Sequence, residues 1–434
     1  MSTRSFNDML KQYLPYKLLS DEIIKRDYFL STVEKDQNWK GGPLQVPFVG
    51  ANASSISFGS LTAEDDISND VFVRGEVSGY KELWGSMKFN QRDLDEHGNL
   101  EQSFLSILPD RIDVFAQSMK EALSGCLLSG GSIATISNVD DADTGVLVVD
   151  RPEVFQVGQK IQIADSANAN MIRGAADGGA ADDTTAFFVT AINLVDGEIT
   201  CSATSGGSAV DLSSAGSATA AYRCAATDKI YRDGSITTAG AEQNMFTSLP
   251  SQLLASSATL FGQTKASYPH LQAYNVTGAG KANTTDLLGH IFDTQTTVRR
   301  LGRGNPSEAI MSYANLAICM KALEGDRTFS VAAGNESDRK GVVYGWSEIQ
   351  VTGVKGSLKL VAVPEMKDDQ ILILDKSSMK LHSNGFIERR SAPDGKEFFE
   401  SRGVNGYTYI LDHRFYGDLV VSKPSNNAII HSLS

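Results

Sequence analysis

The spacing of apolar and polar residues separates a short amino-terminal arm from the rest of the chain. Two short helical signals fall within residues 1–40, and Ser20 is a suitable N-cap for the second because acidic residues follow it directly. Its apolar face is narrow and consists of Ile23, Ile24, Tyr28 and Leu30. So small a face cannot stabilise an independent domain, which predicts an arm that docks on another part of the structure.

A β-rich excursion is predicted next, over residues 47–104. One limb is expected at 54–58 and the other at 82–89, joined through the acidic stretch 64–70. A two-stranded ribbon as polar as this one does not hold its shape alone in water. We therefore expect the ribbon to lie against another copy of the chain.

A long amphipathic helix is predicted after the excursion. Pro109 suits a first helical position, and Gly130 and Gly131 mark the end. Between them, apolar residues recur at steps of three and four, as one buried helix face requires. These residues are Ile112, Phe115, Ala116, Met119, Ala122, Leu123, Cys126 and Leu127.

Residues 139–224 have a different composition, rich in small residues, Asp and Gly, and they predict an inserted β domain. Short alternating runs at 146–149, 160–163, 187–189 and 198–201 read as strands, and Asp196-Gly197 is a hairpin turn between two of them. The pattern favours a small barrel or sandwich with two nearly uncharged loops, around 175–181 and 202–220.

The closing part of the chain predicts helices packed on a mixed sheet, which makes the fold class α+β. Helices are expected at 249–260 and 285–300, with a third capped by Ser312. Residues 371–374 are apolar on both strand faces, so this strand should be covered on both sides. The expected strands are 340–346, 357–363, 370–374, 407–411 and 417–421.

Composition narrows the possible functions. The chain has 434 residues and a formal net charge of −13, which argues against a surface built to hold phosphate backbones. No apolar run approaches the roughly 18 residues that span a bilayer, and the start of the chain lacks a secretion signal. The four cysteines are far apart, without a CxxC pair. We expect folding in a reducing cytoplasm, with no membrane partner.

Catalytic and ligand-binding motifs occur in the sequence only in part. Gly278, Gly280 and Lys281 resemble a phosphate loop, but the upstream glycine is absent and Ala282 stands where Ser or Thr would hold magnesium. The six histidines are scattered singly, without metal-ligand spacing. The acidic turn 140–143 lacks the downstream Glu of a calcium loop. Ser307 and Ser312 have no base nearby in sequence. We predict no catalytic residue, no metal and no cofactor.

The predicted ribbon carries the candidate contact residues. Its aromatic residues could stack on bases, but basic residues are few, so contact between subunits is favoured. Its charged residues would set register and discourage wrong partners. The aromatic candidates are Phe58, Phe72, Tyr80, Trp84 and Phe89, and the charged ones are Arg74, Glu76, Lys81 and Glu82.

The order of these parts resembles that of the HK97-like major capsid proteins of tailed bacteriophages. The closing region carries the resemblance best, through residues 358–366 (LKLVAVPEM), 369–376 (DQILILDK) and 412–424 (DHRFYGDLVVSKP). The resemblance implies the HK97-like capsid fold with an inserted domain. Its parts would be an N-terminal arm (1–46), an extended loop (47–104), a spine helix with the start of the peripheral domain (105–138), the insertion (139–224), the central peripheral domain (225–310), an axial domain (311–405) and a return to the peripheral domain (406–434).

The resemblance also implies a structural role without enzyme activity. Copies would assemble as hexamers and pentamers into an icosahedral shell of the virion that encloses double-stranded DNA without reading its sequence, after assembly in the host bacterial cytoplasm. A scaffolding protein, a portal and a decoration protein are the further partners that it allows. Lys81 and Lys88 lie on the ribbon, but no Asn or Glu partner can be assigned, so no cross-link is carried over. An encapsulin-type compartment shell is the alternative, and a β-rich hydrolase or carbohydrate-binding tail protein is a further one.

Overall fold

The computed structural model divides the chain into two compact units. The first, here called the body, consists of Met1–Gly79, Leu83–Ser124 and Thr247–Ser434, and the second, the insert, of Tyr80–Glu82 and Gly125–Phe246. The structure describes residues 27–39, 42–49, 72–77, 81–90, 100–139, 145–164, 172–173, 186–210, 212, 224–236, 244–255, 259–278, 287–301, 304–322, 349–353, 356–385, 387–390, 398–403 and 406–433.

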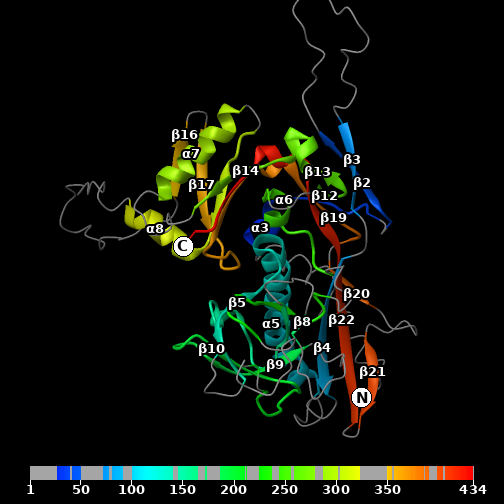
Figure 1. The fold of residues 1–434 in the computed structure, drawn as a ribbon. Coiled ribbons are helices and arrows are strands. Elements are labelled where there is room, and N and C mark those ends of the chain that lie inside the picture. The colour runs from blue at the N-terminus through cyan, green and yellow to red at the C-terminus, as the bar shows by residue number, and fades with distance from the viewer. Residues whose placement is uncertain are drawn as a thin grey trace, which may run out of the picture. The chain divides into compact units, whose positions relative to one another are not determined.

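One sheet of the body joins six described strands with two helices beside them (Figure 1). Helices α7 (Leu287–Arg300) and α8 (Tyr313–Ala322) share a buried apolar cluster with this sheet. All five residues of its third strand are buried, as the apolar run at 371–374 predicts. In spatial order the strands are β14 (Tyr274–Thr277), β23 (Ala428–His431), β18 (Gln370–Leu374), β15 (Glu308–Met311), β17 (Gly356–Ala362) and β16 (Ile349–Gly353).

The other large sheet of the body is built around one long strand, β22 (Gly406–Val421). We expected two strands here, at 407–411 and 417–421, but the polar residues between them continue the period-two pattern, with His413 and Phe415 buried. The strands β4 (Glu82–Asn90), β20 (Glu388–Arg390), β21 (Phe399–Gly403) and β19 (Met379–Ser383) pair with β22, and β1 (Glu34–Asp36) pairs with β19.

Helix α5 (Leu100–Ser129) has 30 residues and begins nine residues before the expected start. Pro109 therefore lies inside the helix, where its missing N–H removes one backbone hydrogen bond. In the expected helix Pro109 would lie in the first turn, where no such bond is lost. The predicted end is confirmed, because the helix stops at Ser129 and Gly130 has a φ of 85°. On its buried face, Phe115 and Met119 pack against Gly85 of β4.

The segment at 249–260 differs from the single helix that we expected. Helix α6 (Leu249–Leu253) has one turn, capped by the Ser248 hydroxyl, and a hairpin of β12 (Thr259–Leu260) and β13 (Gln263–Thr264) follows. Phe261 and Gly262 both have positive φ, 47° and 83°, as a tight two-residue turn requires. The helical spacing of the apolar residues at 249–260 predicted a continuous helix and gave no sign of this turn. The short 3-10 helices η3 (Lys265–Ser267), η4 (Pro269–Leu271), η7 (Lys376–Ser378) and η8 (Pro424–Asn426) complete the connections.

The ribbon differs in its pairing from the prediction. Its described limbs are β2 (Leu44–Val49) and β3 (Phe72–Val77), which run antiparallel. The expected limb at 54–58 and the acidic stretch 64–70 lie outside the described residues. The expected limb at 82–89 is a strand, within β4, but it pairs with β22 in the body sheet. Alternation alone identifies a strand and does not identify its partner.

The insert contains a closed β-barrel. Strand β11 (Lys229–Arg232) pairs with both β5 (Ala134–Val139) and β7 (Lys160–Ala164), which closes a ring through β6 (Val146–Val149), β10 (Glu198–Ser202) and β9 (Phe187–Asn193). Strand β8 (Ile172–Arg173) adds to β7. The predicted turn at Asp196-Gly197 joins β9 and β10, with Gly197 at a φ of 76°. The compact unit extends beyond the range 139–224 on both sides, because β5 begins at Ala134 and the closing strand, β11, lies after residue 224.

Candidate subunit-contact surfaces

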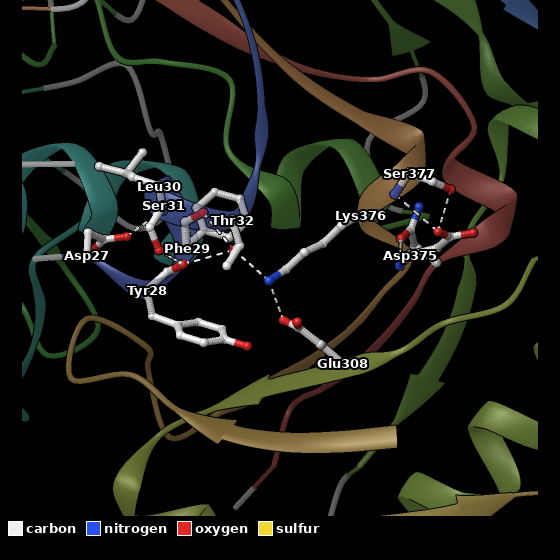
Figure 2. Close-up of polar contacts among 11 residues, drawn as sticks. Asp27, Tyr28, Phe29, Leu30, Ser31, Thr32, Glu308, Asp375, Lys376 and Ser377 are labelled. Atoms are coloured by element: carbon white, nitrogen blue, oxygen red, sulfur yellow. Dashed lines mark hydrogen bonds and ion pairs between the residues drawn. The ribbon is translucent and has the colours of Figure 1, made fainter. Parts of the chain in front are cut away.

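The arm enters the described structure at Asp27. Its Oδ1 accepts a hydrogen bond from the Leu30 backbone N–H at 2.6 Å and so caps helix α3 (Tyr28–Thr32), as Figure 2 shows. Phe29, Leu30 and Val33 are buried. The residues from Asp27 to Asp36 are called the arm segment below. The N-cap predicted at Ser20 lies outside the described residues.

Lys376 of η7 is the polar centre of this docking site (Figure 2). Its Nζ donates to Thr32 Oγ1 and forms an ion pair with Glu308 Oε2, each at 2.5 Å. The ammonium also lies 4.6 Å from the centre of the Tyr28 ring. Burial lowers the pKa of Lys376, while the hydrogen bond and charge of Glu308 oppose that shift. The lysine thus joins the arm segment to β15 through a cation–π contact and charge-assisted bonds.

Strand β1 adds to the edge of the body sheet. It runs parallel to β19, with Glu34 opposite Lys380 and Asp36 opposite His382. The two pairs are in contact, at 2.8 Å between Lys380 Nζ and Glu34 Oε1 and 3.2 Å between His382 Nδ1 and Asp36 Oδ2. The hydrogen bond that Lys380 donates to Glu34 raises the pKa of Lys380, whereas burial lowers the pKa of His382 despite the charge of Asp36. Two carboxylates of β1 therefore face Lys380 and His382 of β19, by the geometry of β-strand addition.

The base of the ribbon packs on its own chain. Val46, Phe48 and Val77 join a buried cluster with Leu260 and Leu271. The packing is close at Gly75, where an added Cβ would lie 2.3 Å from Cε2 of Phe48. The described base therefore has a support within the body, which differs from our expectation that another copy supports the whole ribbon.

The opposite face of the ribbon is exposed. Phe72 is 70 % exposed, and Arg74 and Glu76 are exposed beside it on β3. Their cross-strand partners are Val49, Pro47 and Gln45 in the same order. These three residues of β3, all candidates from the sequence, lie on one surface, which we call the outer ribbon face.

The other sequence candidates are distributed elsewhere. Trp84 of β4 is 45 % exposed and lies 5.6 Å from the Arg414 guanidinium. Phe89 differs from the expectation, because it is 3 % exposed with the Arg111 guanidinium over its ring. Its place on the inward side of β4, facing α5, makes it a core residue of the chain. Lys81 and Glu82 are half-buried. Phe58 and Tyr80 lie outside the described residues.

Sequence reasoning missed the docking site around Lys376 and His382. The acidic residues Glu34 and Asp36 are two positions apart, and so are Lys380 and His382. This complementarity is a usable signal only once β1 and β19 are known to be neighbours. Nearly 350 positions separate them, and no local pattern specifies that pairing.

The described residues give no sign of a metal site. Among these residues, no three His, Cys, Asp or Glu side chains lie close enough together to hold a metal ion. The four cysteines are free thiols, and burial raises the pKa of Cys201 to about 12 and that of Cys319 to about 11. Such thiols stay protonated and unreactive. In the described part of the chain, no helix has the length and apolar character needed to cross a membrane.

Comparison with known proteins gives structural matches only. No model of a known family matches the chain, and no curated protein matches its sequence. The capsid asymmetric unit of cyanophage A-1(L) is similar with a TM-score of 0.47 and 10% identity, over 92% of this chain and 91% of that one. The capsid of a native GTA particle gives 0.43 and 10%, over 93% and 90%. The capsid of Myoviridae phage XM1 gives 0.37 and 9%, over 94% and 91%.

These solved structures are phage and GTA capsids. All three TM-scores lie below 0.5, and identity near one residue in ten carries no residue roles from one chain to another. The function must follow from this chain's own surfaces.

Proposed function

We propose that this chain is the major capsid protein of a tailed bacteriophage. Copies assemble as hexamers and pentamers into an icosahedral shell around double-stranded DNA. The observation that carries the proposal is the outer ribbon face, on which Phe72 is 70 % exposed beside Arg74 while the opposite face packs on the body. A ribbon base that packs on the body with one face and exposes an aromatic side chain on the other is suited to bind an identical neighbour.

The chemistry of the outer ribbon face fits a contact between subunits. Specific interfaces combine a central aromatic anchor with a polar rim, and here Phe72 is the anchor while Arg74 and Glu76 supply charges of both signs. Opposite charges side by side favour one register and disfavour others. The formal net charge of −13 also suits a shell that encloses DNA without binding it.

The order of the elements supports the same proposal. The arm segment, the ribbon, the 30-residue helix α5, the inserted barrel and a closing α+β part follow one another as in the family that the chain resembles. We assign residues 311–405 to the axial domain, and residues 225–310 and 406–434 to the peripheral domain. The location is the virion, with assembly in the host cytoplasm, and a scaffolding protein, a portal and a decoration protein are candidate partners.

Shortening the ribbon tests the proposal. Val49 and Phe72 face each other across the ribbon, so an Asn-Gly turn can replace residues 50–71 without changing the register. We expect a folded, soluble subunit that no longer forms particles under negative-stain electron microscopy. Normal particles from this variant would contradict the proposal.

Excision of the barrel is the matched control. Gly131 and Met245 lie side by side, since a Cβ on Gly131 would be 2.3 Å from the Met245 sulfur, so residues 132–244 can be replaced by a short glycine linker. The body should remain folded and should still assemble. Nuclease-protected DNA inside particles from phage-producing cells would distinguish a virion shell from a compartment that holds enzymes.

A further inference from the structure

The β12–β13 hairpin holds the edge of ribbon strand β3. The Glu76 backbone N–H donates to the Phe261 carbonyl at 3.0 Å, and Gln263 Nε2 donates to the Arg74 carbonyl at 2.8 Å. The ring of Phe261 stacks on Phe48, with the ring centres 6.0 Å apart. Phe261 has a φ of 47°, in the left-handed region that is unfavourable for a residue with a Cβ. Such strain persists where surrounding contacts enforce it, and these contacts are with the ribbon.

Helix α6 holds the end of β22 through one side chain. Gln252 is fully buried, and its Nε2 donates to the Leu419 carbonyl at 2.8 Å while its Oε1 accepts from the Val421 backbone N–H at 2.9 Å. The carboxamide therefore binds β22 as a neighbouring strand would. Separating the two would leave buried polar groups without partners, which is costly.

Lys265 joins the hairpin to the helix. It follows β13 directly and is 5 % exposed. Its Nζ donates to three carbonyls at the end of α6, those of Gln252 at 2.7 Å, Leu254 at 2.9 Å and Ser251 at 3.4 Å. Among the described residues, no carboxylate forms an ion pair with it. The buried ammonium depends on these carbonyls, because moving away from them would leave its charge unpaired.

We propose that helix α6, the β12–β13 hairpin and Lys265, together called the bracket, open and close as one cooperative unit that connects the ribbon base to β22, with Lys265 as the link between its two halves. Local opening in cooperative units of this size is common in folded proteins. The meaning for assembly rests on the proposed function: a neighbouring copy that displaces the ribbon would thereby act on the body sheet.

A second route between the same two places must be separated from the bracket. Phe48 of the ribbon and Val420 of β22 belong to one buried apolar cluster. Gly262→Ala perturbs the ribbon end of the bracket alone, because Gly262 has a φ of 83° and an added Cβ would meet nothing within 4 Å, so the strain stays in the turn. Lys265→Met removes the ammonium and keeps the length of the side chain.

Hydrogen exchange of the full, unassembled chain tests the proposal at the backbone amides of Glu76 and Val421, since bracket atoms accept both hydrogen bonds. Burial lowers the pKa of Lys265 to about 8, so exchange is measured at about pH 6.5, where the ammonium is charged. Gly262→Ala should speed exchange about fivefold or more at Glu76, and by the same factor at Val421, because the members of one unit open together.

Lys265→Met should speed exchange at both amides by about tenfold, as expected when hydrogen bonds from a charged donor are lost. Adding Gly262→Ala to this chain should then affect Glu76 and leave Val421 unchanged. Lys423→Met is the matched control, because Lys423 is exposed and lies two residues after Val421; it should change neither amide. The amides of β18 report opening of the whole body and should keep their rates in all variants.

Three results would overturn the proposal. Gly262→Ala could leave Val421 unchanged, or could speed its exchange equally with and without Lys265, in which case the apolar cluster carries the coupling. Lys265→Met could speed exchange in β18 as much as at Val421, in which case the lysine stabilises the body as a whole. Failure of the natural chain to form shells would reject the proposed function and leave the bracket intact.

Discussion

Replacing Phe72 by Ser should raise the concentration at which the protein assembles while leaving the isolated chain intact. A phenylalanine buries about 150–250 Å² when fully covered. Phe72 is 70 % exposed, so about 100–175 Å² remains for a neighbour to cover. At about 25 cal/mol per Å², full coverage would contribute at most about 2.5–4.4 kcal/mol, and half coverage about 2 kcal/mol.

Each subunit would lose this contribution once, so the critical concentration for assembly should rise about 30-fold, the factor that corresponds to about 2 kcal/mol. The stability of the unassembled chain should change by no more than about 0.5 kcal/mol, because the side chain is exposed. Sedimentation at increasing protein concentration measures the first quantity, and urea unfolding the second.

Val195→Ser is the matched control, because Val195 is 92 % exposed on the hairpin turn of the insert and the proposal places no shell contact there. It should leave the critical concentration unchanged. An unchanged critical concentration for Phe72→Ser, or an equal rise for both variants, would mean that Phe72 is not covered by a neighbouring subunit.

Two further changes test the packing and the docking. Gly75→Ala places a Cβ 2.3 Å from Cε2 of Phe48 and should cost about 1–3 kcal/mol in urea unfolding; a neutral result would mean that the ribbon base shifts freely. Lys376→Met leaves the Glu308 carboxylate, 15 % exposed, without its ammonium and should cost about 3 kcal/mol, much of which Glu308→Gln in the same chain should restore. Additive losses in the double variant would exclude a coupled pair.

Elements with a strong local pattern could be predicted from the sequence. The fully apolar run at 371–374 indicates a strand covered on both faces, and its burial confirms this. The helix expected at 285–300 ends at Arg300 as predicted and begins at Leu287, two residues after the expected start. In both cases neighbouring residues alone carry the information, because one face or two faces of a single element must be buried.

Pairings between distant segments could not be predicted. The alternation at 82–89 identified a strand, yet its partner β22 lies more than 300 residues away. For the same reason the sequence could not show that Phe72 is exposed and Phe89 buried, because the exposure of each side chain depends on which strand face the body covers. The ion pair between Lys376 and Glu308 likewise exists only through tertiary packing.

Negative-stain electron microscopy of the purified chain shows directly whether it assembles into a shell. We expect closed, isometric shells of uniform size above a critical concentration. Discrete small oligomers at all concentrations and salt conditions, with no curved or closed assemblies, would contradict it.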